Sequence, residues 1–494
     1  MNSTFGPADY AVLAAYFAVC AFVGWWAGRG QKDTKDYFKG GGRMPMWAVC
    51  LSILATETSA LTFCSVPGQA FTKDHTYLQL IAGYILGRIL VGTVFLPAFF
   101  RAGVTTVYEY LGLRFGDLTR GLASVAFLAT RTMADGVRLT AASIAMHAAT
   151  GWDFNLCIVL FAVVTVVYSV FGGIKSIIWT DVLQFFLFVG GGLLALAYIA
   201  ATADGGPAGL WAAIPEGKMR MIDAAPVFDR PFTLLAALIA APVFTLATHG
   251  TDQDLAQRML TCRGALDGKR SVILSGILNV PMVFLFLCVG TALSVWYGAH
   301  PDPSLPAQAD RVFPHFIVTR LPVGVRGLVI AAVFAAAMST LSSAVGALSS
   351  TATVDVYRRY LRAGADETHY LRASRVISAL VAAGIVGVAL GVKDNPSLLN
   401  LGLEIMTYAY GALLGVFVLG TVTRRGSDRG NLLAMVSGVG AVIAAKNAQA
   451  VAAAFGLTLA HGIAWPWYTL IGMSVTVGIG FLFPSDPERL GKLR

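Results

Sequence analysis

Residues 324–352 read GVRGLVIAAVFAAAMSTLSSAVGALSSTA, a run of small and apolar residues with a single charge at Arg326. The run is long enough to cross a bilayer, because a helix needs about 20 mainly apolar residues to do so. The whole chain shares this character. Its residues are 56% hydrophobic and only 13% charged, whereas soluble domains carry about 25% charged residues. The composition predicts an all-α polytopic membrane protein and argues against a water-soluble fold.

Similar apolar runs recur along the 494 residues and predict about thirteen transmembrane helices. The predicted spans are approximately 8–28, 45–70, 76–100, 121–149, 155–172, 177–203, 232–251, 271–298, 324–352, 373–392, 398–423, 431–455 and 464–484. The two longest predicted loops, 204–231 and 299–323, are too short for a soluble domain.

Basic residues predict how the chain is oriented in the membrane. Most of the 36 Lys and Arg residues fall in the loops after odd-numbered spans and in the C-terminal tail. The positive-inside rule then places the N-terminus outside and the C-terminus in the cytoplasm, in the inner (plasma) membrane of the cell. The net charge of +9 is spread over these short loops, so no nucleic-acid partner is expected.

Polar residues interrupt two of the predicted spans. Residues 54–62 read LATETSALT, with Glu57 in the middle, and residues 248–254 read THGTDQD. A broken helix at such a run would free backbone carbonyls, which bind ions and substrates in many transporters. The alternative is a continuous helix whose hydroxyls bond back to carbonyls one turn earlier. Glu57 favours the functional interpretation, whereas His249 on its own is interpreted more readily as a hydrogen-bonded core residue than as a ligand.

Hydroxyl residues share one face of the 324–352 span. Ser339 is three and four positions from Ser342 and Ser343, and residues at these spacings are neighbours on a helix. Several neutral oxygens that face one point suit a hard cation. The alternative is that the small residues simply allow close helix packing.

Charged residues in two other spans have more than one interpretation. Asp181, near the start of 177–203, is either a helix cap or a functional carboxylate. Arg131, Asp135 and Arg138 are three and four positions apart on the fourth span. This spacing favours an intrahelical ion-pair ladder over direct contact with a substrate.

Five stretches of the chain resemble the solute:sodium symporter family. They are, in chain order, DYFKGGGR at 36–43, IWTDVLQ at 178–184, QR at 257–258, AAVFAAAMSTLSS at 331–343 and DVY at 355–357. The resemblance covers nearly the whole chain and is most specific at 331–343. It implies a transporter that uses Na+ and not an enzyme, and the chain contains neither an HExxH nor a GxSxG motif.

The resemblance also implies a LeuT-type fold of two inverted five-helix repeats. The first repeat would occupy 45–203 and the second 232–423. The other segments would be an extra span with its cytoplasmic loop at 1–44, an extracellular loop at 204–231, and two final spans with a short tail at 424–494.

Carried over position by position, the resemblance implies two sodium sites. The first would use the backbone carbonyls of Ala55, Thr58 and Ala336 and the hydroxyls of Ser339 and Thr340. The second, present in some members, would use Asp181, Ser339, Ser342 and Ser343. The expected solute-binding residues are Glu57, Ser59, Thr62, Tyr77, Asp135 and His249.

The cargo remains open between several classes of solute. The chain is similar to bacterial sodium/sialic acid, sodium/galactose and sodium/proline symporters. In the sialic acid members an arginine that binds the sialate carboxylate would align near Ala134, and Glu57 replaces a small hydroxyl residue. Two anions in a dry pocket repel, so an acid sugar is expected less than a neutral sugar, polyol or nucleoside.

An amino acid or another amine is the alternative cargo, because an ammonium could pair with Glu57. A membrane solute sensor is the alternative without transport. The expected partners are the solute, sodium ions and the lipid bilayer, and the protein is expected to be a monomer.

Overall fold

The computed structural model describes residues 5–29, 31, 33–393, 398–458 and 460–491. These residues form helices and connecting loops, and no β-strand is assigned among them. The α-helices before the longest helix, α9, are α1 Pro7–Ala27, α2 Thr34–Lys39, α3 Met46–Glu57, α4 Ala60–Thr72, α5 Tyr77–Leu90, α6 Leu96–Ala102, α7 Val107–Arg114 and α8 Asp117–Thr150.

The second half of the chain continues in the same way. Its α-helices are α9 Phe154–Thr202, α10 Gly206–Ala212, α11 Ala241–Gly250, α12 Gln253–Leu260, α13 Ala265–Ala299, α14 Val312–Arg320, α15 Val325–Thr351, α16 Glu367–Val392, α17 Leu398–Val422, α18 Asp428–Lys446, α19 Ala448–Ala454, α20 Pro466–Phe481 and α21 Pro487–Gly491. Short 3-10 or π-helical segments are η1 Gly40–Gly42, η2 Val91–Phe95, η3 Ala236–Ala240, η4 Ala309–Arg311 and η5 Ala352–Leu361.

The helices match the predicted spans in position, but the number of spans is not settled at thirteen. Each predicted range overlaps a helix. Among the described residues, seven helices are long and apolar enough to cross a membrane, or nine if each bent pair counts as one span. The predicted range 155–172 and all but the last residue of 177–203 fall within the single helix α9, and α20 has only 16 residues.

A glycine divides α9 into two parts. The helix has 49 residues, and a straight helix of that length would be about 74 Å long, more than twice the roughly 30 Å of a hydrocarbon core. Gly173 breaks it with φ 57° and ψ −159°. A Cβ atom at this position would lie 2.6 Å from the carbonyl oxygen of Tyr37. The bend therefore requires glycine both for its backbone angles and for its lack of a side chain.

Nine of the helices form two groups that also contact each other, since α3 packs on α9 as well as on α13. The α13 group consists of α3, α4, α5, α11 and α13, in which α13 packs on α3, α4 and α5, and α5 packs on α11. The α15 group consists of α8, α9, α15 and α16, in which α15 packs on α8, α9 and α16. In the most apolar stretch of Val325–Leu361, which includes α15, 89% of the residues are buried. In the corresponding stretch of α1 only 22% are buried. Helix α15 therefore lies at the centre and α1 at the periphery.

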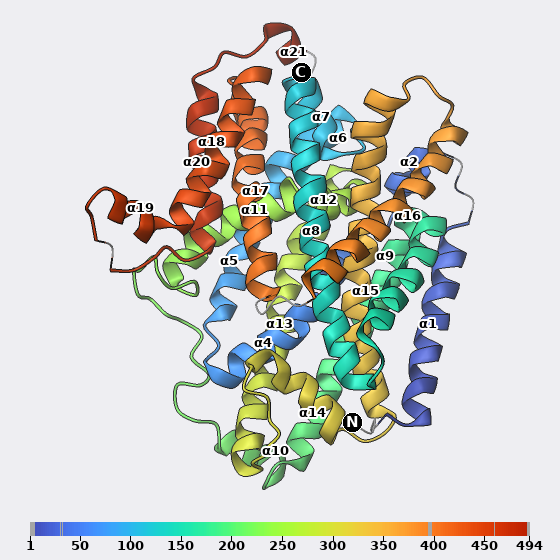
Figure 1. The fold of residues 1–494 in the computed structure, drawn as a ribbon, viewed down its shortest axis with the longest axis vertical. Helices are drawn as coiled ribbons and strands as arrows, with labels where there is room; N and C mark the ends of the chain where they lie inside the picture. Colours follow the sequence, from blue (N-terminus) through green and yellow to red (C-terminus); the bar gives the residue numbers. More distant parts are fainter. Residues whose placement is uncertain (1–4, 30, 32, 394–397, 459, 492–494) are drawn as a thin grey trace.

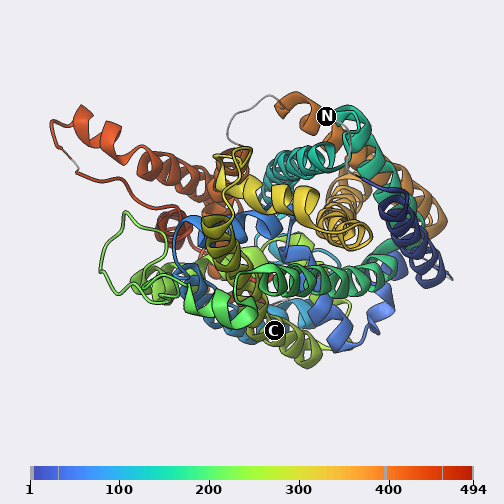
Figure 2. The ribbon, with the colours of Figure 1, turned by 90° about the horizontal axis from the view of Figure 1, so that it is seen from below.

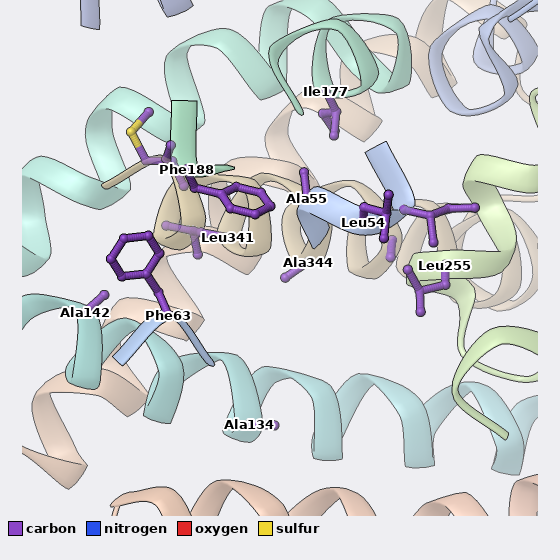
Figure 3. Packing of buried hydrophobic residues seen from close by; sticks show 14 of the residues in the cluster. Leu54, Ala55, Phe63, Ala134, Ala142, Ile177, Phe188, Leu255, Leu341 and Ala344 are labelled. Carbon is purple, nitrogen blue, oxygen red and sulfur yellow. The ribbon is translucent and has the colours of Figure 1, made fainter. Parts of the chain in front are cut away.

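The first and last described helices reach opposite ends of the molecule. Helix α1 begins near α10 and α14, and α21 lies at the other end (Figure 1). Viewed from below, α1 and the α18–α19 segment lie at opposite edges of the helix array (Figure 2). Buried apolar side chains from both helix groups meet in the interior, where Leu54 and Ala55 of α3 lie close to Ile177 and Phe188 of α9 and to Ala344 of α15 (Figure 3).

Candidate functional site

The polar run at 54–62 breaks the helix, as predicted. Helix α3 ends at Glu57, Thr58 is extended with φ −85° and ψ 90°, and α4 begins one residue after Ser59. The side-chain oxygen of Ser59 accepts a hydrogen bond from the Thr62 N–H at 3.3 Å and so caps α4. The axes of the two helices are bent by 62°. The alternative of a continuous helix is therefore wrong.

The break frees the carbonyl of Ala55. In a continuous helix it would accept from the N–H of Ser59, four residues on. That N–H instead donates to the Glu57 carbonyl at 3.2 Å. The Ala55 carbonyl accepts from the Ser339 hydroxyl of α15 at 2.9 Å. The broken helix thus presents a main-chain oxygen to the hydroxyl face of α15.

Four of the five residues predicted for the first sodium site meet at this point. The Ser339 hydroxyl also donates to the Ala336 carbonyl at 3.1 Å, and the Thr340 hydroxyl donates to the same carbonyl at 3.1 Å. Ser339 is 0% exposed and Thr340 3%. The fifth residue, Thr58, is buried in the broken segment. All these oxygens are neutral, which fits a hard monovalent cation.

The residues predicted for the second sodium site surround an arginine. Oδ2 of Asp181 accepts from the Ser52 hydroxyl at 2.5 Å and from Nη2 of Arg258 at 3.1 Å. The same Nη2 contacts the Ser343 hydroxyl, and the Ser342 hydroxyl donates to the Ser339 carbonyl at 3.1 Å. Asp181 lies inside α9, so its interpretation as a helix cap is wrong. Its other oxygen, Oδ1, is buried and has no hydrogen-bond partner among the described residues.

Glu57 is paired on both of its carboxylate oxygens. Oε2 accepts from Nη2 of Arg88 at 2.7 Å, and Oε1 contacts Nε2 of His249. Nη1 of Arg88 donates to the Ser275 hydroxyl at 2.6 Å. We call these four residues the Glu57 cluster. They come from α3, α5, α11 and α13, so the cluster lies entirely within the α13 group.

The sequence analysis missed the role of Arg88. An arginine in an apolar span must find a partner. Of the intramembrane carboxylates singled out from the sequence, Glu57 in the neighbouring span is the one closest to Arg88 along the chain. His249, 3% exposed, is hydrogen-bonded and buried, in keeping with its interpretation as a bonded core residue.

A second set of buried charges surrounds Arg131. The predicted ladder on α8 is present, because Nε of Arg131 donates to Asp135 at 2.7 Å and Nη1 of Arg138 to Asp135 at 3.1 Å. The other nitrogens of Arg131 reach beyond α8. Nη1 donates to Asp252 at 2.9 Å, and Nη2 contacts Asp254.

The two aspartates mark the second predicted helix break. Helix α11 ends at Gly250, and Asp252 caps α12 by accepting from the Asp254 N–H at 2.9 Å. Asp254 also accepts from Nη1 of Arg258 at 2.9 Å. Spacing could not reveal these partners, but the polar run at 248–254 was the signal that pointed to them.

Arg258 joins this set of charges to Asp181. The connected side chains, which we call the Arg131 network, are Arg131, Arg138, Arg258, Asp135, Asp181, Asp252 and Asp254. With every group ionised, the network holds four carboxylates and three guanidinium groups, so it is one positive charge short of balance. It joins α8 and α9 of the α15 group to the α11–α12 break.

The predicted solute residues fall on two sides of the α3–α4 break. Glu57 and His249 belong to the Glu57 cluster, and Tyr77 packs against Phe232 with ring centroids 5.1 Å apart. Ser59 and Asp135 instead line a cavity of about 10 Å³ beside Thr340, which is room for about one water molecule. The Thr62 hydroxyl lies 3.3 Å from that of Ser59.

A larger cavity lies elsewhere, near the end of the molecule that contains α2 and α7. Its volume is about 550 Å³, and its lining includes Lys35, Glu109, Arg120 and Arg359. None of the predicted site residues lines it.

Known proteins with sequences similar to this chain are sodium-coupled transporters. The model of the sodium:solute symporter family matches residues 37–438. A sodium/sialic acid symporter of Proteus mirabilis is 30% identical over 451 residues, which are 90% of this chain and 90% of that protein. A sodium/glucose cotransporter of Vibrio parahaemolyticus is 27% identical and aligns over 87% of this chain and 83% of its own length.

A solved structure extends the comparison to three dimensions. It is the substrate-bound, outward-open state of a Na+-coupled sialic acid symporter, and it superimposes with a TM-score of 0.86 at 28% sequence identity. The match covers 98% of this chain and 99% of that one.

Proposed function

Since the chain belongs to the sodium:solute symporter family, we propose that it imports a small polar organic solute such as a sugar, polyol or nucleoside by alternating access. Its family and relatives make it a multi-pass membrane transporter coupled to sodium and not an enzyme. We further propose five-helix inverted repeats at 45–203 and 232–423, flanked by 1–44, 204–231 and 424–494.

The observation that carries this proposal is the meeting of the freed Ala55 carbonyl with the hydroxyls of α15. Sodium would bind the carbonyls of Ala55, Thr58 and Ala336 and the hydroxyls of Ser339 and Thr340. The two hydroxyls now donate to these carbonyls. A bound ion would require them to rotate, so that their lone pairs rather than their protons face the site.

A second sodium ion would bind at Asp181 with Ser339, Ser342 and Ser343. The support is the unpartnered Oδ1 of Asp181 and the missing positive charge of the Arg131 network. Two sodium ions would then enter with each solute molecule. Asp181→Asn should lower the Hill coefficient for sodium in uptake measurements, and an unchanged coefficient above one would refute this assignment.

The pairing of Glu57 with Arg88 favours an uncharged solute. Arg88 already balances its charge at 2.7 Å, so no ammonium is needed to neutralise it. Each carboxylate oxygen can still accept a further hydrogen bond from a solute hydroxyl. An amine would have to share Glu57 with Arg88 and would meet the repulsion of a like charge.

An acid sugar is the second candidate cargo, because the relatives include sodium/sialic acid symporters. Ala134 offers no charge to such a substrate. Arg138, one turn further along α8, lines the small cavity with Ser59 and Thr340. Its pairing with Asp135 at 3.1 Å opposes the binding of a carboxylate.

We propose that the protein works as a monomer in the plasma membrane, with its N-terminus outside and its C-terminus in the cytoplasm. The start of α1 and the position of α21 at opposite ends of the molecule support an odd number of crossings (Figure 1).

The test is thermal melting of the purified protein in sodium and in potassium, followed by a solute screen in sodium. A ligand at a hundredfold excess over its Kd stabilises the folded state by about 2.7 kcal/mol. A sodium-specific rise in Tm that one solute class increases would support the proposal and select the cargo for uptake into proteoliposomes. The same Tm in both salts, with folded protein, would overturn it. A further rise with N-acetylneuraminate, and none with neutral sugars, would favour the acid-sugar alternative.

A further inference from the structure

Arg258 lies inside the residues proposed to hold the second sodium ion. It is 0% exposed, and its side chain extends from α12 toward α9 and α15. Its Nη2 donates to Asp181 at 3.1 Å and contacts the Ser343 hydroxyl. Two of the four proposed sodium ligands are thus already in contact with a cation that belongs to the protein.

The remaining nitrogens of Arg258 contact other elements. Nε donates to the Ser52 hydroxyl of α3 at 2.9 Å. Nη1 donates to the Asp254 side chain at 2.9 Å and to its carbonyl at 2.7 Å. Asp254 lies one turn before Arg258 on the same helix, so that half of the guanidinium group keeps its partners whether or not the other half contacts Asp181.

We propose that Arg258 is a tethered cation that competes with the second sodium ion for Asp181. The inference rests on the proposed second sodium site. Oδ2 of Asp181 is held by Ser52 and Arg258, while Oδ1 is free to face an ion. A sodium ion at Oδ1 would be repelled by the guanidinium group on the other oxygen of the same carboxylate, because like charges repel strongly in a low-dielectric interior.

The competition has a structural consequence for α12. The contact of Arg258 with Asp181 holds α12 against α9, and the contact with Ser343 holds it against α15. Sodium at Asp181 weakens both contacts and leaves Arg258 on Asp254, which is shared with Arg131 of α8. Occupancy of the second site is thereby coupled to the attachment of the helix that follows the α11–α12 break.

A purely structural role for Arg258 makes a different prediction. Removing this buried partner leaves Asp181 without a cation and Asp254 with Arg131 alone, which destabilises the protein in any salt. Competition requires in addition that the variant binds sodium more tightly, because Asp181 then loses its internal cation. The dependence of stability on sodium therefore separates the two roles.

The experiment uses the full-length protein with Arg258→Gln and follows Tm through a sodium titration in which potassium keeps the ionic strength constant. We expect a lower Tm in potassium, a larger rise with sodium, and a midpoint sodium concentration at least about fivefold below that of the wild type. Arg258→Met, which is also neutral and of similar length, replaces the Gln variant if that variant does not fold.

Two further variants make the result specific. Adding Asp181→Asn to Arg258→Gln should remove the gain in sodium affinity. Arg114→Gln removes a buried arginine outside the Arg131 network, one that donates to the carbonyls of Thr423 and Arg425, and it should leave the midpoint unchanged. A midpoint in Arg258→Gln or Arg258→Met equal to or above that of the wild type overturns the inference. A wild type that does not respond to sodium at all instead overturns the proposed function.

Discussion

The Glu57 cluster and the Arg131 network are both buried sets of charges, yet they connect different parts of the molecule. The Glu57 cluster joins α3, α5, α11 and α13, which pack together as one group. The Arg131 network joins α8 and α9 to the α11–α12 break and so reaches from one group to the other. Alternating access in transporters of this kind moves one set of helices against another. If the proposed function moves the α13 group against the α15 group, the Glu57 cluster would stay within one moving body, whereas contacts of the Arg131 network would cross the boundary.

The largest effect is expected for Arg131→Met. The substitution leaves Asp135, Asp252 and Asp254 without their shared partner, and breaking one side of a buried ion pair costs about 3–5 kcal/mol. We expect a lower yield of folded protein, a lower Tm and no uptake. Arg131→Lys keeps the positive charge but lacks the planar set of N–H donors that reaches three carboxylates, so it should recover part of the stability. A fully stable Arg131→Met protein would show that the network does not hold the two groups together.

Glu57→Gln should have the next largest effect, because it breaks a buried pair within a single group. The expected loss is about 3 kcal/mol, and Tm measures it. Replacing both partners, in Glu57→Gln with Arg88→Met, should recover much of that stability, because neither charge is then left buried without its partner.

The double variant should still show the sodium-specific rise in Tm, since the first sodium site does not use these side chains. If the folded double variant loses the sodium response, Glu57 belongs to the sodium site. The Glu57 cluster and the Arg131 network would then not differ in their relation to sodium.

Much of this comparison could not have been predicted from the sequence, because spacing detects partners only along one helix. The ladder of Arg131, Asp135 and Arg138 follows from positions three and four apart. The partners Asp252 and Asp254 are more than one hundred residues further along the chain, and their contacts depend on the crossing of α8 with the α11–α12 break.

Helix breaks were easier to predict than pairing. The polar runs at 54–62 and 248–254 interrupt apolar spans, and the structure breaks both helices there. The bend of α9 could also be predicted, since its two halves together contain more residues than a single membrane crossing needs. The pairing of Glu57 with Arg88 was not, because several arrangements of α3 and α5 would satisfy the same hydropathy pattern.

A smaller effect is expected for Ser339→Ala, which tests the oxygens between the two groups. The variant loses hydrogen bonds of about 1 kcal/mol each, so Tm in potassium should change little. The sodium-specific rise should largely disappear, because a ligand of the first site is gone. Thr340→Ser keeps its hydroxyl and serves as the matched control, with a nearly unchanged sodium response. A full sodium response in Ser339→Ala would contradict the first sodium site.

The smallest effect is expected at an exposed pair that belongs to neither set. Arg220 donates to Asp74 at 2.9 Å, and its side chain is 55% exposed. Arg220→Ala should therefore lower the free energy of unfolding by about 1 kcal/mol or less. A larger loss would show that the 204–231 loop contributes to the packing of the helix groups.

This pair also has a pH dependence of known sign. Burial raises the pKa of Asp74, but hydrogen bonds from Thr76 and Arg220 outweigh that effect and hold the pKa below its usual value. The stability that the pair contributes is therefore present above the ordinary carboxyl range and is lost as the pH falls through the lowered pKa. Melting curves at falling pH should show a smaller acid-induced loss in Arg220→Ala than in the wild type.

The bend at Gly173 has a consequence for the order in which the protein assembles. The carbonyl of Tyr37 occupies the space that a side chain at residue 173 would fill, and the Tyr37 hydroxyl donates to the Val170 carbonyl at 2.9 Å. The side chain of Gln31 contacts the Gly172 carbonyl in the same way. During synthesis this N-terminal segment leaves the ribosome well before α9 does. The residues that fit the bend are thus synthesised before it, and the two halves of α9 can fold against them as they emerge.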